Sequence, residues 1–348
     1  MPNIAEIDKN FKIETNIDRE DIKFYNARTA PFKIYGIYHE DGKFRRMPEA
    51  VAKTVSPSVL ALHANTAGGR LRFRTNSPYI AISAKMPSVG KMSHFALCGS
   101  SGFDIYINGE HYRTYMPPFN FDGGYEGIVD VPGEDMKEVL INFPLYSDVS
   151  ELYVGLSKSA KVEAPTPYSL EKPVVYYGSS VTQGGCASRA GTSYQGFISR
   201  ELDIDYINLG FSGSARAEKE MYEYISKLDM SVFVMDYDYN STSAEHLTET
   251  HERMFLAIRE AQPELPIIIL TLPKYTLPEW ARVRRDIIRG TYERALSRGD
   301  KNVYFIDGPT LMALCGDEGT VDTTHPTDLG FYSMASAVSK VLREILGK

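Results

Sequence analysis

The sequence predicts a two-domain α/β protein, in which a three-layer α/β/α domain with a parallel sheet follows an antiparallel, jelly-roll-like β-sandwich. The first half of the chain contains short strand-like segments and no long amphipathic helix, whereas the second half alternates apolar strands with helices. At 348 residues the chain also exceeds the usual size of one hydrophobic core. We therefore expect domains at residues 1–165 and 166–348, joined near the proline-rich segment 161–173.

Segments rich in β-branched and aromatic residues recur through the first half. In one of them Leu71 and Phe73 alternate with polar neighbours, which is the period of a half-exposed strand. Turn signals such as Asn108-Gly109 separate the segments. The predicted strands lie within residues 33–39, 70–76, 79–86, 103–109, 138–145 and 151–157. Such a series of short strands is typical of a β-sandwich.

The second half predicts a parallel sheet because its strand segments are almost continuously apolar, as strands buried on both faces are. The strands are expected within residues 174–178, 206–210, 231–239, 267–273 and 303–308. Helices are expected near residues 193–202, 216–228, 244–262, 283–298 and 329–346. In the third of these, Leu247, Met254, Phe255 and Ile258 share one face at helical spacing. Active-site loops should follow the carboxyl ends of the strands.

Charge and composition restrict the classes of partner. The net charge is −7, whereas nucleic acid binding needs a basic face, so neither nucleic acid nor an anionic membrane is an expected partner. No stretch approaches the ~20 apolar residues of a membrane helix. The first residues, MPNIAEIDKNF, contain no basic region followed by an apolar run, so we expect a cytoplasmic location. The oligomeric state is left open.

The cysteines and histidines predict neither disulfides nor a metal site. Cys98, Cys186 and Cys315 form an odd, sparse set that fits no zinc spacing. His246 and His251 are five residues apart, which misses the i, i+4 spacing of a helical metal pair. Apart from His325, the remaining histidines are scattered through the first half of the chain: His39, His63, His94 and His111. Cys186 directly follows the segment 176–185 that is described next, and we interpret it as part of the wall of a site there.

The segment YYGSSVTQGG (176–185) is the first that suggests chemistry. A predicted strand ends at Gly178, and small residues then lead toward a helix. Such a turn can present the Ser180 hydroxyl at the tip of the sheet, with backbone N–H groups close by. A plain strand-to-helix turn is the alternative interpretation.

The segment VDTTHP (321–326), just before the last helix, is the second. It places Asp322 three residues before His325, so that one short loop can hold a carboxylate against an imidazole. The carboxylate would set the tautomer of the ring, whose other nitrogen would remove the proton of a serine. Most Asp-x-x-His pairs occur by chance and are solvated loop residues. This pair is informative because it follows the final predicted strand of the domain.

These segments resemble the blocks of SGNH (GDSL-type) hydrolases in their order. Ser180 matches the family's nucleophile, Thr182 and Gly184 match the tail of the same block, and Asp322 and His325 match the closing Asp-x-x-His. The resemblance covers about residues 173–348. It implies a serine esterase with a Ser180–His325–Asp322 triad and no cofactor. Ser179 departs from the pattern, since most of the family has Asp there.

The resemblance also implies an oxyanion hole formed by Ser180 and two further blocks. NLGFSG (208–213) matches the second block, with Gly213 as the backbone donor and Gly210 as the alternative. DYDYNS (236–241) is an irregular match to the third, Gly-x-Asn-Asp, whose asparagine donates a side-chain N–H. An ungapped alignment places Tyr239 at that position; we favour Asn240, one residue later, and Tyr239 could donate its hydroxyl instead.

The substrate is expected to be an ester on a carbohydrate. The upstream sandwich resembles the N-terminal domain of carbohydrate esterase family 2, whose members deacetylate sugars, and the loops at 184–195 and 241–246 are polar. Arg189 is a weak candidate for binding the sugar and could equally be solvated. Trp280, the only tryptophan, could stack on a sugar ring or serve in packing. The predicted activity is hydrolysis of short-chain, acetyl-type esters; the alternatives are a lipid or thioester acylhydrolase of the same fold and a non-catalytic carbohydrate-binding protein.

Overall fold

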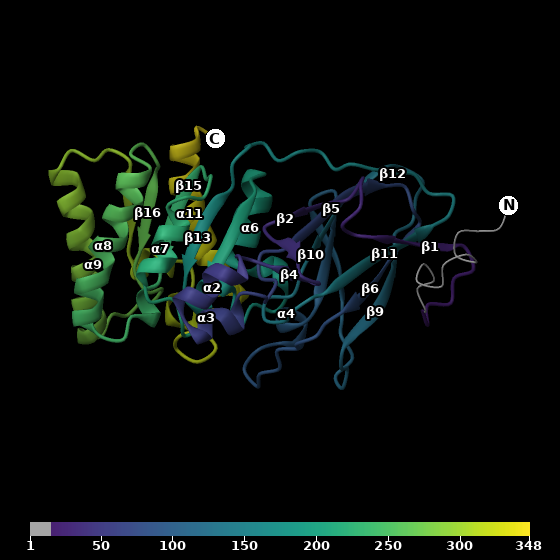
Figure 1. The fold of residues 1–348 in the computed structure, drawn as a ribbon, viewed down its shortest axis with the longest axis horizontal. Helices are drawn as coiled ribbons and strands as arrows, with labels where there is room; N and C mark the ends of the chain where they lie inside the picture. The colour runs from purple at the N-terminus through teal and green to yellow at the C-terminus, as the bar shows by residue number, and fades with distance from the viewer. Residues whose placement is uncertain (1–14) are drawn as a thin grey trace.

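The computed structural model describes residues 15–348 and consists of a β-sandwich packed beside a helix-covered parallel sheet (Figure 1). Residues 1–14, on which the expectation of a cytoplasmic location depended, lie outside the described part. Within residues 15–348, no helix combines the length and the apolar composition needed to cross a bilayer.

The sandwich consists of two antiparallel sheets. The first has four strands in the order β1 (Ile22–Asn26), β11 (Glu151–Ser157), β6 (Tyr79–Lys85) and β9 (Gly124–Asp130). The second has the order β12 (Val162–Glu163), β5 (Arg70–Thr75), β10 (Lys137–Asn142), β7 (Phe103–Ile107) and β8 (Glu110–Tyr115), with β2 (Lys33–Tyr35) also paired to β5. Leu71 and Phe73 of β5 point into the core between the sheets, as their alternation predicted.

The second half is a three-layer α/β/α unit. Its parallel sheet has the order β14 (Tyr206–Gly210), β13 (Val174–Gly178), β15 (Val232–Asp236), β16 (Ile267–Leu270) and β17 (Val303–Ile306). One face is covered by α7 (Lys219–Ile225), α8 (Ala244–Ala261) and α9 (Glu279–Ser297), the other by α6 (Tyr194–Leu202) and α11 (Asp328–Leu346). Tyr177 packs on the first face and Tyr176 on the second, so successive residues of β13 fill opposite layers. The predicted fold class is confirmed.

The first half also contains helices that the sequence did not predict. A hairpin of β3 (Tyr38–Glu40) and β4 (Lys43–Arg45) leads into α2 (Glu49–Val55) and α3 (Pro57–Leu62). Ala52 and Val59 on these helices pack in the same core as Val175 and Leu209 of the parallel sheet. Figure 1 shows α2 and α3 on the side of the molecule where the parallel sheet lies. Both helices are too short for a helical period to stand out, although Ser56 caps α3 and Pro57 starts it. Part of the first half therefore completes the α/β core, and the division at residue 165 stays a prediction.

Candidate active site

The loops that follow β13, β14 and β15 meet at one edge of the parallel sheet. In the sheet, β13 lies between β14 and β15. The order of the strands reverses beside β13, and in doubly wound sheets the crevice that binds ligands opens at such a reversal. Close packing demands glycine at two of these strand ends. A Cβ at Gly178 would come within 2.2 Å of the Asp236 carbonyl oxygen, and one at Gly210 would lie 2.2 Å from the Gln183 nitrogen.

Ser180 is the first residue of α5 (Ser180–Gln183), directly after β13. The Ser179 hydroxyl accepts a hydrogen bond from the Val181 N–H at 3.2 Å and so caps this short helix. Serine at 179, where aspartate is the family's usual residue, thus supplies the cap that starts the helix. Ser180 itself is 6% exposed, so its hydroxyl lies in a sheltered position.

Ser180, His325 and Asp322 form one hydrogen-bonded chain. Ser180 Oγ lies 2.9 Å from His325 Nε2, and His325 Nδ1 lies 2.8 Å from Asp322 Oδ2. With the Nδ1 proton directed at the carboxylate, Nε2 has a free lone pair that accepts the serine proton. The hydroxyl, imidazole and carboxylate thus lie in the order that a nucleophile, a base and an orienting carboxylate would need for acyl transfer.

The loop around His325 keeps Asp322 ionised. Partial burial by itself raises the pKa of the carboxyl, but hydrogen bonds from the His325 backbone N–H and imidazole outweigh it and lower the pKa to about 2. The backbone N–H groups of His325 and Thr324 reach Asp322 Oδ1 at 2.8 and 3.1 Å. The carboxylate is therefore held by its own loop and remains an acceptor for the imidazole at neutral pH.

Three N–H groups near Ser180 are candidates for an oxyanion hole. Ser180 N, Gly213 N and Asn240 Nδ2 have no hydrogen-bond acceptor among residues 15–348. The side chain of Asn240 is tied to the second block, because its Oδ1 accepts from the Ala215 N–H at 3.2 Å. That bond directs the amide NH₂ group away from Ala215. Gly213 adopts φ +67°, a conformation that suits glycine, and nothing lies within 4 Å of where a Cβ would be.

The two alternative donors are placed differently. The N–H of Gly210 already donates to Asn208 Oδ1 at 2.9 Å, so it is not free for an oxyanion. Tyr239 packs against the core on the α6–α11 side of the sheet, and its hydroxyl is buried without a partner among the described residues. Burial raises the pKa of Tyr239 well above its usual range. The geometry favours Gly213 and Asn240 over Gly210 and Tyr239.

A buried carboxyl lies beneath the nucleophile turn. Asp236, the last residue of β15, accepts hydrogen bonds from Thr182 Oγ1 at 2.8 Å and from the Tyr194 hydroxyl at 3.1 Å. Burial raises the pKa of Asp236 to about 7, against the opposing effect of these two hydrogen bonds. Thr182, which matches the tail of the family's serine block, thus ties α5 to the end of β15.

The sandwich half supplies residues that sequence reasoning missed. The Tyr146 hydroxyl donates to the carbonyl oxygen of Ser180 at 3.2 Å. Arg46 is buried and donates to the carbonyl oxygens of Asn208 and Gly210, at the end of β14. Gln183 joins the two halves, because its Nε2 donates to Asn65 Oδ1 at 3.1 Å while its Oε1 accepts from Ser212 N at 3.0 Å. No local pattern marks these residues, since each acts across a long sequence separation.

His94 brings the sandwich to the triad itself. It lies in the loop between β6 and α4 (Leu97–Ser100), and its ring centroid is 5.5 Å from that of His325. An exposed imidazole from the first half of the chain therefore lies beside His325.

Arg189 is not brought to the triad. Its guanidinium lies against the sandwich, with Nε 3.5 Å from Asp104 Oδ2 of β7. Asp104 is fully buried and also accepts hydrogen bonds from Gly191 N and Asn142 Nδ2, both at 2.9 Å. Arg189 therefore helps to dock the loop after α5 onto the sandwich, and its role in binding a sugar stays a prediction.

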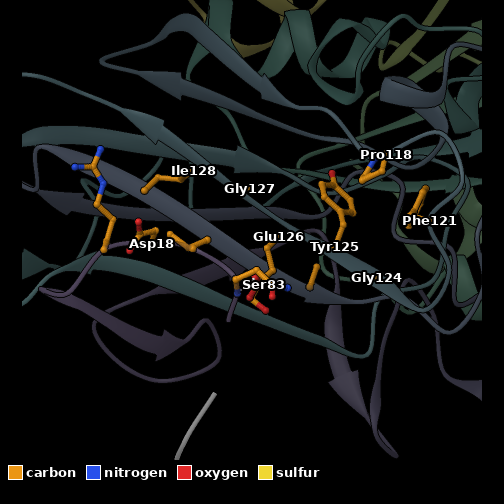
Figure 2. A pocket seen from close by; sticks show the side chains of 13 residues that line it. Asp18, Ser83, Pro118, Phe121, Gly124, Tyr125, Glu126, Gly127 and Ile128 are labelled. Atoms are coloured by element: carbon orange, nitrogen blue, oxygen red, sulfur yellow. Dashed lines mark hydrogen bonds between the residues drawn. The ribbon is translucent and has the colours of Figure 1, made fainter. Parts of the chain in front are cut away.

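Trp280 and a large cavity on the sandwich are also separate from the triad. Trp280 is 51% exposed on the first turn of α9, and no contact in the described chain connects it with Ser180 or His325. A cavity of about 870 Å³ lies on the sandwich over β6 and β9, lined by residues such as Tyr125, Glu126 and Asp18 (Figure 2). Its residues contain no nucleophile and base pair, so cavity size does not locate the chemistry here.

Comparison with known protein families matches both halves of the chain. Residues 171–343 match the GDSL-like lipase/acylhydrolase family, and residues 22–162 match the N-terminus of SGNH-hydrolase-type esterases, a family named for the pattern Gly-x-Asp-Leu-Tyr. The segment from Gly102 to Tyr106 carries this pattern with isoleucine in place of leucine, and its aspartate is the buried Asp104. No curated protein matches the chain.

Several solved structures share the whole architecture. A protein of Bacteroides ovatus ATCC 8483 described as a GDSL-like lipase is 31% identical, with 94% of this chain and 98% of that one covered and a TM-score of 0.84. The salicylyl-acyltransferase SsfX3 from a tetracycline biosynthetic pathway is 21% identical over the same shares, with a TM-score of 0.75. An acetyl xylan esterase, Est2A, from the rumen bacterium Butyrivibrio proteoclasticus is 13% identical over 94% and 99% of the two chains, with a TM-score of 0.62.

Proposed function

Because the chain belongs to the GDSL-like lipase/acylhydrolase family and is a carboxylic ester hydrolase, we propose that it removes short acyl groups, above all acetyl, from carbohydrates. The observation that carries the proposal is the hydrogen-bonded chain from Ser180 through His325 to Asp322, with successive distances of 2.9 and 2.8 Å.

The proposed reaction has two acyl-transfer steps. His325 Nε2 takes the proton of Ser180 as Oγ attacks the ester carbonyl carbon, and Asp322 stabilises the imidazolium that forms. His325 then returns the proton to the oxygen of the leaving alcohol as the acyl-enzyme forms. Water, activated by the same imidazole, attacks the acyl-enzyme and releases the carboxylic acid. Ser180 N, Gly213 N and Asn240 Nδ2 would hold the oxyanion in both steps, each donor lowering the barrier by about 3–4 kcal/mol.

Two features support a carbohydrate ester as the substrate. The loop 184–195 after Ser180 consists mostly of small and hydroxyl-bearing residues and contains no large aliphatic side chain. An acetyl xylan esterase has the same two-part fold, although at 13% identity it bears on architecture rather than on specificity.

A second candidate, an acylhydrolase for longer lipid chains, also has an observation in its favour. Large apolar side chains are exposed on the segments that flank His325, namely Leu314, Val321 and Leu329. Such exposed side chains could contact an acyl chain. The two candidates share the triad and differ in acyl length.

The triad is tested with Ser180→Ala assayed on p-nitrophenyl acetate. We expect kcat to fall by at least about 10⁴-fold, since the nucleophile is lost. A fluorophosphonate probe should label the folded wild-type chain at Ser180 and leave the variant unlabelled. Ser188→Ala serves as the matched control, because it removes a hydroxyl of the same loop that donates to Asp328 Oδ2. Unchanged turnover in Ser180→Ala would exclude it as the nucleophile.

The substrate class is tested with two series run beside Ser180→Ala. Acetate release from acetylated mono- and oligosaccharides should exceed release from simple alkyl acetates. On p-nitrophenyl esters, kcat/KM should fall from acetyl to octanoyl. A steep rise with chain length instead would favour the lipid candidate, and turnover with neither series would contradict both.

A further inference from the structure

Three potential metal ligands from distant parts of the chain converge beside the nucleophile. His94, Cys186 and His325 each offer one ligand atom, and these atoms all lie within 4.8 Å of one another. His94 belongs to the sandwich, Cys186 to the loop after α5, and His325 to the loop before α11. No other group of this kind occurs within residues 15–348.

The fold holds His94 in place through its neighbour. Phe95 is buried and packs edge-on against Tyr146, with ring centroids 5.2 Å apart, and Tyr146 in turn donates to the Ser180 carbonyl oxygen. The Phe95 N–H also donates to the Met92 carbonyl oxygen at 3.2 Å, which closes a tight turn around residue 94. The turn is thereby anchored to the nucleophile segment, while the imidazole of His94 stays exposed and free to rotate toward a ligand.

Cys186 is held in an unusual backbone conformation. Its φ is +73°, which is uncommon for a residue with a side chain, and it follows the tight turn at Gly184 and Gly185. The Gly185 N–H donates to the Ser180 carbonyl oxygen at 2.8 Å, so this turn is fastened directly to the nucleophile. The thiol is thus directed toward the site at a cost in backbone energy.

His325 is already oriented as a metal ligand would be. Its Nδ1 is bound to the carboxylate of Asp322 at 2.8 Å, which leaves Nε2 as the coordinating atom. A carboxylate behind the imidazole is the usual arrangement for histidines that bind zinc, since it sets the tautomer and raises the basicity of the ligand. Two imidazoles and a thiolate suit a borderline-soft ion, and three protein ligands leave a fourth position open.

We propose that His94, Cys186 and His325 form an inhibitory site for a thiophilic divalent cation such as Zn²⁺. Tetrahedral bonds of about 2.0–2.3 Å require ligand atoms roughly 3.3–3.8 Å apart, so the present cluster needs to contract by about 1 Å. The exposed imidazole of His94 can make that movement by rotation.

Occupation of the site would stop the esterase, a consequence that rests on the proposed function. The cation takes the Nε2 lone pair that otherwise accepts the proton of Ser180, so the nucleophile loses its base. Burial raises the pKa of the Cys186 thiol to about 12. The thiol is therefore protonated at neutral pH, and it gives its proton to the buffer as the bond between sulfur and metal forms.

Metal binding is tested separately from activity. The full-length chain is titrated with Cd²⁺ and followed by its thiolate-to-metal charge-transfer absorption. We expect one bound ion per chain, and affinity reduced at least about tenfold in Cys186→Ser and in His94→Ala, because losing a ligand should cost no less than losing its supporting partner. Cys315→Ser is the control, because Cys315 is a partly exposed free thiol that lies outside the cluster. His94→Ala changes an exposed side chain, so it stays informative if Cys186→Ser fails to fold.

Inhibition is then measured with Zn²⁺ on p-nitrophenyl acetate, each variant normalised to its own metal-free rate. Wild type and Cys315→Ser should be inhibited alike and recover with a chelator, whereas His94→Ala should need at least about tenfold more Zn²⁺. A Cd²⁺ band that survives in Cys186→Ser, or equal Zn²⁺ sensitivity in His94→Ala and wild type, would overturn the site. Ser180→Ala should bind Cd²⁺ like wild type, so failure of the proposed nucleophile leaves the binding test intact.

Discussion

Replacing Asp236 with asparagine should stabilise the protein increasingly as the pH rises. The carboxyl lies at the end of β15 beneath the nucleophile turn and is fully buried. Asparagine keeps the shape of the side chain and an oxygen that can accept from Thr182 and Tyr194, and it cannot ionise. The substitution therefore isolates the cost of a buried charge.

The magnitude follows from the pKa. Burial raises the pKa of Asp236 from 3.8 to about 7 in the folded chain, so folding favours its neutral form. The stability that the neutral carboxyl contributes is fully present below pH 3.8 and is lost as the pH rises to about 7. At 1.36 kcal/mol per unit, the loss is about 2 kcal/mol at pH 5 and about 4 kcal/mol at pH 8. The advantage of Asp236→Asn should therefore grow by about 2–3 kcal/mol between these values.

Urea unfolding of the two proteins at pH 5 and pH 8 measures this difference. Asp229→Asn provides the control, because Asp229 is a solvent-exposed carboxylate on the surface. Its difference from wild type should be nearly the same at both pH values, since its charge does not have to be buried. A difference between Asp236→Asn and wild type that stays constant, or shrinks toward pH 8, would refute the assignment of a raised pKa.

The remaining predictions concern catalysis. Asn240→Ala should lower kcat on p-nitrophenyl acetate by about 10²–10³-fold, while Tyr239→Phe should change it little; the reverse order would make the Tyr239 hydroxyl the donor. Asp322→Ala should lower kcat by about 10⁴-fold with little change in KM, and a near-normal kcat would show that the imidazole needs no carboxylate. The fragment 166–348, expressed alone, should be inactive and unfold at lower urea than the full chain, because it lacks Tyr146 and α2–α3; full activity in the fragment would contradict this.

The elements that the sequence predicts best are those whose signals are local. Each strand of the parallel sheet is a short apolar run, and the structure begins or ends it within a few residues of the predicted position, as at 174–178. Ser180, Asp322 and His325 lie in short segments at strand ends, where the fold class alone brings them to one edge. The spacing of Asp322 and His325 within one loop also makes their contact a local property.

The residues that sequence reasoning missed act at long range. Tyr146 reaches a carbonyl group 34 residues away, and Arg46 one that is 164 residues away. Nothing in the local pattern around either residue indicates its partner, because a tyrosine or an arginine near a strand has many ordinary roles. Arg189 illustrates how a local pattern can leave a contact unpredicted. A polar loop near the nucleophile suggested contact with substrate, and only the packing of Asp104 shows that it faces the sandwich.

Buried charged side chains join the two halves of the chain. Arg70 of the sandwich is buried against the start of the parallel sheet, where it pairs with Asp205 and stacks 3.7 Å from the ring centroid of Tyr206. At the carboxyl end of β14, Arg46 donates to the carbonyl oxygens of Asn208 and Gly210, just before the loop that contains Gly213. Both guanidinium groups are buried and find their acceptors across the junction, so removing an acceptor while the halves stay packed would leave a buried charge without its partner, which is costly. The segment proposed to supply the Gly213 donor is therefore held by Arg46, which precedes Ser180 by more than a hundred positions, so the family's sequence blocks alone do not describe the candidate site.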